Sequence, residues 1–290
     1  MNAFKRKILI FCLPLFFSDL AAAKIEVVLG IPLAKNLNLP GIIPDASTSE
    51  IIVSREQYVL SYNKERRSPN WVAWKLEAHQ MGSSGRTNDF QEDKDLELFL
   101  KQSHSPYEVV GPGEFSGSCY DRGHQVPSAD RTDTVNNNRS TFIMSNIVPQ
   151  TPFLNRGLWQ QLEQHTRTLV KRDQKKVYVI AGPIYGKNYG SIGPKKDIPV
   201  PSMNFKILIV LDAHQSLNDI NDKTPMVAVI MPNTHQDGTV LAETPFGKCP
   251  TFSPEIVASD DWKKFSSNLA EIEAASNLRI FSKLPAENLQ

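Results

Sequence analysis

The chain has 290 residues, and its 32 Lys and Arg nearly balance its 31 Asp and Glu, for a formal net charge of +1 at pH 7. This balance excludes a globally basic protein, so any hold on a polyanion must come from a local patch of cations. The length is near the upper limit for one hydrophobic core and no internal repeat divides the chain, which predicts a single domain.

The first 23 residues have the pattern of a cleaved secretory signal. Three cations at 5–7 precede an apolar run at 8–17 and three alanines at 21–23. The run is shorter than the roughly 20 apolar residues that span a bilayer, and its flanks favour a signal over a buried N-terminal helix. The segment carries a net charge of +2, which leaves the mature chain at about −1. We therefore expect a secreted or periplasmic protein with no membrane attachment after cleavage.

Cysteine usage changes when the signal is removed. Cys12 leaves with it, and the mature chain keeps Cys119 and Cys249. An even pair in an oxidising compartment is a candidate disulfide. Two free buried thiols are the alternative, and the sequence does not decide between them.

Residues 24–50 are rich in Pro, Asn and Ser and predict an irregular lead-in to a domain that spans 24–290. Apolar and alternating runs predict strands at 51–53, 58–62, 71–76, 177–183, 205–211 and 226–231. A polar loop is expected at 81–95, a short strand with a turn at 119–126, and a strand or an extended segment at 141–147. Because strands and helices do not alternate regularly, we expect an α+β protein with a central mixed or antiparallel sheet flanked by helices.

Helical spacing begins near residue 155 and recurs at 254–282. The apolar side of the first helix would contain Leu154, Leu158, Leu162, Leu169 and Val170. A second row at intervals of four would place on one face Asn155, Trp159, Glu163 and Arg167. The helix would thus present an amide and a carboxylate on neighbouring turns.

The polar residues of this region have the chemistry needed to hydrolyse a phosphodiester. His124 can accept a proton near neutral pH, and Gly123 before it would permit an unusual turn. Asn155 is a neutral oxygen ligand of the kind that Mg²⁺ accepts, and Glu163 could hold a water of the ion. Taken singly, each has an ordinary alternative: a structural histidine, a helix N-cap, or an ion-pair partner one turn from an arginine.

The motifs closely resemble those of the DNA/RNA non-specific endonucleases, the family of the Serratia nuclease and mitochondrial endonuclease G. The main ones are Asp-Arg-Gly-His at 121–124, Ser-Asn-Ile-Val-Pro-Gln at 145–150 and Leu-Asn-x-Gly-x-Trp-x-x-Leu-Glu at 154–163. Further similarity lies at 70–74, 177–185 and 200–201, within a resemblance that runs from about residue 58 to 284.

The resemblance implies a ββα-metal (His-Me finger) fold and a role for each matching residue. His124 would be the general base for water. Asn155 would be the one direct protein ligand of a Mg²⁺ ion, for which Mn²⁺ could substitute, and Glu163 would hold a water of its shell. The metal or one of its waters would protonate the leaving 3′-oxygen, so cleavage would leave 5′-phosphate ends. Both DNA and RNA would be cut, because phosphate contacts carry no base sequence information and need not touch the 2′ position.

The same resemblance implies that cations hold the phosphate. Arg122 and Arg167 would contact it or orient their neighbours, and Arg86 would stabilise the scissile group. Asn146 would form a hydrogen bond that helps to place His124. Other candidates for a phosphate track in the motif block are Arg131, Arg139 and Arg156.

Two rival functions remain open at this point. One is a non-catalytic nucleic-acid-binding protein on the same scaffold, and the other is a phosphodiesterase for small substrates in a closed pocket. The other histidines lack zinc-site spacing, and no P-loop or dinucleotide fingerprint is present. The oligomeric state is also open, with a homodimer among the options.

Overall fold

The structure, a computed structural model, describes residues 25–26, 42–44, 50–241, 249 and 261–280. The expected signal at 1–23 and Cys12 lie outside these residues. The centre of the fold is a seven-stranded sheet in the order β12-β11-β8-β5-β4-β3-β2, and each of these described neighbours is antiparallel. Its strands are β2 (Ile42–Pro44), β3 (Glu50–Ser54), β4 (Val59–Asn63), β5 (Ser68–Leu76), β8 (Lys175–Ile184), β11 (Met203–Asp212) and β12 (Met226–Pro232). The predicted α+β class and central sheet are confirmed.

Alternation along the central strands gives the sheet two apolar faces. In β8, Val177 and Val179 pack into one cluster, whereas Ile180 packs into the cluster on the opposite face. In β11, Leu208 belongs to the first cluster, and Phe205, Ile207, Ile209 and Leu211 belong to the second. Burial on both faces explains why these strands are almost continuously apolar.

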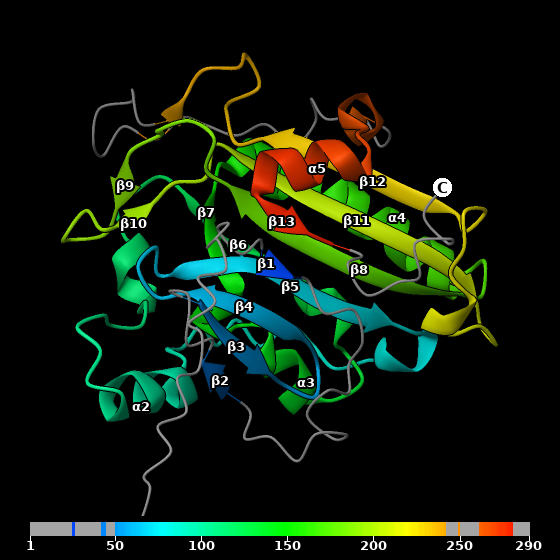
Figure 1. Ribbon diagram of the computed structural model, residues 1–290, viewed down its shortest axis with the longest axis horizontal. Coiled ribbons are helices and arrows are strands. Elements are labelled where there is room, and N and C mark those ends of the chain that lie inside the picture. The colour runs from blue at the N-terminus through cyan, green and yellow to red at the C-terminus, as the bar shows by residue number, and fades with distance from the viewer. Residues whose placement is uncertain (1–24, 27–41, 45–49, 242–248, 250–260, 281–290) are drawn as a thin grey trace, which may run out of the picture.

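Helices cover both faces of the sheet. They are α2 (Lys94–Gln102), α3 (Val135–Ser140), α4 (Gln160–Lys171) and α5 (Leu269–Ser276). Figure 1 shows α5 in front of β11 and β12 and α4 behind them. The apolar stripe of α4 packs Leu162 and Val170 against the first cluster, and Ile272 of α5 packs against the second. None of the helices in the described segments is long and apolar enough to cross a bilayer.

A ββα unit precedes and includes α4. Strands β6 (Asp121–His124) and β7 (Ile147–Gln150) pair antiparallel, and a π-helical segment η5 (Leu154–Trp159) continues into α4. Gly123 is needed here for a different reason from the expected one. It lies within β6 and not in a turn, and a Cβ at this position would overlap the side chain of Gln150. The glycine therefore permits a close approach between the two strands.

Several local expectations were displaced or wrong. The strand expected at 141–147 begins only at Ile147, after a 3₁₀ turn at Met144–Asn146. Within 254–282, the described part contains a 3₁₀ turn (Asp261–Phe265), α5 and the short strand β13 (Leu278–Arg279), not one long helix. The lead-in contains β2 and also β1 (Ile25–Glu26), which pairs parallel with β13.

Cys119 and Cys249 form a disulfide, with Cα atoms 5.2 Å apart and a sequence separation of 130. This confirms the predicted candidate pair. The bond joins the residue two positions before β6 to a segment that follows the last strand of the sheet. It therefore braces the entry to the ββα unit.

Candidate active site

The residues of the sequence motifs converge on a cavity of about 250 Å³ at the ββα unit. Its lining includes Arg86, Arg122, His124, Ser128, Asn155, Arg156, Gln160, Glu163 and Arg167. A neighbouring open cavity of about 410 Å³ shares Arg86, Arg122, Asn155 and Arg156 with the first. The pattern of four-residue steps predicted that Trp159 would follow Asn155 on the same face. The π-helical segment instead brings Gln160 to the cavity and turns Trp159 into the core, where it is 1% exposed.

His124 lies at the end of β6 and is held by its surroundings. Its ring packs edge-on against Phe142, with centroids 4.8 Å apart, and lies 5.4 Å from Phe90. Its carbonyl oxygen accepts a hydrogen bond from Nε1 of Trp159 at 3.1 Å, which ties β6 to the helix. The imidazole Nε2 is buried and has no hydrogen-bond partner among the residues described. That nitrogen is therefore available to a ligand of the cavity.

Burial, followed by the positive charge of Arg86, lowers the pKa of His124 to about 3. The imidazole is consequently neutral at physiological pH, the state in which it can accept a proton. A cation at this position would be desolvated by two phenylalanine rings and repelled by a guanidinium group. The local structure therefore favours a base over a fixed positive charge.

Asn155 is oriented by a salt-bridged carboxylate. Its Nδ2 donates to Oδ2 of Asp121 at 2.8 Å, and Arg156 donates from Nε and Nη2 to the same carboxylate at 2.8 and 2.6 Å. This contact uses the amide nitrogen, which leaves the amide Oδ1 for another partner at the cavity. Asn155 is not the N-cap of its helix, because Thr151 Oγ1 accepts from the backbone N–H of Leu154.

The donor set fits a hard cation that keeps most of its water. In the described part of the chain, no cluster of three or more His, Cys, Asp or Glu could hold a metal ion. Asn155 offers one neutral oxygen, and Glu163 lines the same cavity. Mg²⁺ prefers oxygen, dehydrates reluctantly and often takes only one or two protein groups. The residues therefore fit such an ion and do not fit a structural zinc site.

Glu163 belongs to a charge cluster that sequence reasoning found only in part. Its carboxylate lies 4.0 Å from Arg167, and Nη1 of Arg167 donates to Asp130 at 3.2 Å. On its other side, Glu163 lies 3.7 Å from Nζ of Lys206, a residue of β11 that is 1% exposed. The Lys206 ammonium also lies 3.9 Å from the centre of the Trp159 ring. The one available signal was a lysine inside an otherwise apolar strand.

Burial shifts the pKa values of Glu163 and Lys206 in opposite directions. It raises the pKa of Glu163, against the opposing effect of Lys206 and Arg167, and it lowers the pKa of Lys206. A partly desolvated carboxylate next to a buried ammonium is costly to separate from its partner. Lys206 therefore keeps the Glu163 carboxylate at the cavity wall.

Arg86 and Arg122 also line the cavity. Arg86 donates to Asn88 at 2.7 Å and to Ser128 at 2.6 Å, and its guanidinium lies over the ring of Phe142. Arg122 donates twice to the carbonyl of Pro112, at 3.2 and 2.8 Å, and stacks on Phe90. Both guanidinium groups are thus fixed in place and line both cavities.

Three sequence candidates, Asn146, Arg131 and Arg139, lie outside the cavity, and Arg139 donates to Asp89 at 2.8 Å. Asn146 is fully buried, accepts from Val126 N–H at 3.0 Å and donates to the carbonyls of Val126 and Thr141. It braces the backbone just after His124, in keeping with its expected positioning role. Arg131 was wrongly considered part of a phosphate track, because it is 1% exposed and donates to backbone carbonyls of the neighbouring strands and turns.

Known proteins are similar to this chain in sequence. A nuclease of Nostoc sp. is 35% identical over 257 residues, which cover 87% of this chain and 81% of that relative. Human mitochondrial endonuclease G is 31% identical over 202 residues, covering 66% of this chain and 62% of the relative. The nuclease of Serratia marcescens is 31% identical over 173 residues, with 58% and 61% covered.

Structure and family comparisons agree with these relatives. The crystal structure of an EndoG/EndoGI complex matches 82% of this chain and 88% of its own chain, with a TM-score of 0.60 and 25% identity. The profile of the DNA/RNA non-specific endonucleases matches residues 42–287. This chain is therefore a member of the DNA/RNA non-specific endonuclease family.

Proposed function

We propose that this protein is an exported, Mg²⁺-dependent endonuclease that hydrolyses phosphodiester bonds in both DNA and RNA without sequence preference. The observation that carries the proposal is the meeting, in one cavity, of a neutral buried histidine, an oriented amide oxygen, a carboxylate and four arginines. A protein that only binds nucleic acid needs the arginines but not the desolvated base. The open second cavity also favours a polymer over a small enclosed substrate.

The residues divide the reaction between them. His124 would accept the proton of the attacking water at Nε2, which the fold leaves without a partner among the residues described. Arg86 and Arg122 would hold the scissile phosphate, and Arg167 would hold it or orient Glu163. These contacts would be made only to phosphate, which accounts for cleavage without regard to base or sugar.

Asn155 and Glu163 would hold the divalent ion, the first through Oδ1 and the second through a water of its shell. Asp121 keeps the amide in the required orientation. When bound, the ion would supply positive charge to the transition state and help protonate the leaving 3′-oxygen, giving 5′-phosphate ends. Mn²⁺ satisfies the same ligands and should substitute.

The test is nicking of supercoiled plasmid and degradation of RNA by the mature chain, with Mg²⁺, with Mn²⁺ and with chelator. A His124→Ala variant should lose cleavage of both substrates, while the exposed His214→Ala serves as the matched control and should remain active. End-group analysis of the products should give 5′-phosphate. Binding of plasmid without cutting under either metal would instead establish the non-catalytic rival.

Export is proposed from residues 1–23 and is supported by the disulfide, a bond that persists in oxidising compartments. N-terminal sequencing of the protein from cell fractions tests this directly. The expected result is a chain that starts at Lys24 in the periplasm or medium. An uncleaved chain inside the cell would refute it.

A further inference from the structure

A third cavity, of about 620 Å³, continues the groove away from the active site. It shares Ser116 and Tyr120 with the open second cavity, which in turn shares Arg122 and Asn155 with the site around His124. Each of the three cavities therefore adjoins the next through shared lining residues. A strand with a phosphate at the active site would reach the third cavity with its neighbouring nucleotides.

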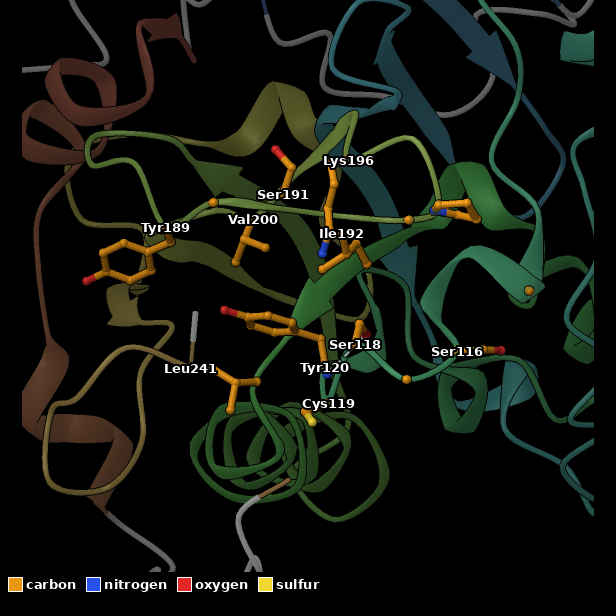
Figure 2. A pocket seen from close by; sticks show the side chains of 15 residues that line it. Ser116, Ser118, Cys119, Tyr120, Tyr189, Ser191, Ile192, Lys196, Val200 and Leu241 are labelled. Carbon is orange, nitrogen blue, oxygen red and sulfur yellow. Dashed lines mark hydrogen bonds between the residues drawn. The ribbon is translucent and has the colours of Figure 1, made fainter. Parts of the chain in front are cut away.

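The third cavity has a different character from the arginine-lined site. Figure 2 shows the ring of Tyr120 between Val200 and Leu241, with its hydroxyl directed toward the side where Tyr189 lies. Val200 and Leu241 are buried, and Tyr189 is half-buried at the edge. This aromatic and apolar part of the wall suits the flat face of a nucleobase, and Lys196 lines the same cavity.

A buried polar atom faces this cavity without a partner. The Tyr120 residue is 8% exposed, and its hydroxyl has no hydrogen-bond partner in the described part of the protein. Burial and the neighbouring Tyr189 raise the pKa of Tyr120, so the phenol stays neutral and can both donate and accept. Buried polar groups are normally satisfied, and a ligand that supplies a hydrogen bond would satisfy this one.

We propose that this third cavity receives an unpaired base of the strand whose phosphate lies at the active site, so that single strands bind more tightly than duplexes. A base inside a duplex is stacked and paired, and it cannot enter a cavity without first leaving the stack. Stacking does not depend on base identity, because every base has a π-face. The inference rests on the proposed nuclease function and assigns its preferred substrate class.

Binding is measured with the mature His124→Ala protein in chelator, so that no strand is cut. The ligands are a fluorescent dT 12-mer, its duplex and a 12-mer whose sugars carry no bases. Tyr189→Ala should weaken binding of the dT 12-mer by about five- to a hundred-fold and leave the abasic strand unchanged. Tyr107, half-buried in a separate cavity, supplies the matched control, and Tyr107→Ala should change neither affinity.

Tyr120→Phe isolates the hydroxyl because it keeps the ring. It should weaken binding of the dT 12-mer by about two- to ten-fold without lowering the melting temperature, since the hydroxyl has no hydrogen-bond partner among the described residues of the free protein. An unchanged affinity would overturn the role of this hydroxyl.

Two results would overturn the base pocket. One is equal affinity of the His124→Ala protein for the dT 12-mer and for the duplex. The other is an equal loss of affinity for the base-bearing and the abasic strand when Tyr189→Ala is added. Plasmid nicking by the wild-type chain tests the nuclease separately. Nicking together with unaltered binding in Tyr189→Ala refutes the pocket alone. Base-dependent binding without nicking refutes only the nuclease.

Discussion

Acid should destabilise this protein through His124 more than through an exposed histidine. Its folded-state pKa is lowered to about 3 from an ordinary value of 6.5. Between these values the unfolded chain binds a proton that the folded chain refuses, so the free energy of unfolding falls as the pH drops through 6.5 and levels off near 3. The two-unit interval from 6.5 down to pH 4.5 corresponds to a loss of about 2.7 kcal/mol.

The wild type and a His124→Phe variant are both acidified and compared. The variant keeps an aromatic ring among Phe90 and Phe142 but cannot be protonated at this position. Urea unfolding followed by tryptophan fluorescence at pH 7 and pH 4.5 gives the free energy of unfolding of each protein. The wild type should lose about 2–3 kcal/mol more than the variant over this interval. The His214→Ala control should follow the wild type.

Each protein loses some free energy of unfolding between pH 7 and pH 4.5, and the comparison uses the difference between the two losses. The titration of carboxylates that both proteins share cancels in this difference. If wild type and His124→Phe lose the same free energy of unfolding on acidification, then His124 is protonated equally in the folded and unfolded states. That result would refute the assignment of His124 as a desolvated, neutral imidazole.

Three further changes test the surrounding structure. Lys206→Met should lower the free energy of unfolding by about 3 kcal/mol at pH 7 and by less at pH 5, where Glu163 can take up a proton; urea titrations at both pH values check this. Loss of the Cys119–Cys249 bond, which closes a loop of 130 residues, should cost about 5 kcal/mol. A double serine variant should then match the reduced wild type in chemical unfolding, and a difference between them would contradict this. Gly123→Ala should lower stability by about 1–3 kcal/mol, measured by thermal unfolding, because the added methyl group overlaps a buried side chain of the paired strand.

Much of the fold followed from local pattern. Alternation and continuous apolar runs located the main strands, because side chains on successive strand residues point to opposite faces and both faces are buried here. The positions of His124, Asn155 and Glu163 also followed from the sequence. They lie within one ββα unit, where the chain itself limits how far apart they can be.

Local pattern failed at an irregular helical turn and at a side chain held by residues distant in sequence. Steps of four residues placed Trp159 beside Asn155, but the π-helical segment rotates the helix and buries Trp159 under His124. Arg131 looked like its neighbouring arginines in sequence, yet its backbone partners come from separate strands and turns. Hydrogen bonding to distant carbonyls leaves no periodic signal in the sequence.

The sequence by itself determined which chemical groups the site contains, because their types and spacing are encoded within short segments. Only the tertiary structure decided what surrounds them. Lys206 reaches Glu163 from a strand that follows it by some forty residues, and the third cavity joins Tyr120 to Tyr189 and Leu241. Contacts of this kind depend on how the sheet and helices pack, and burial created by that packing lowers the pKa of His124 and keeps its imidazole neutral.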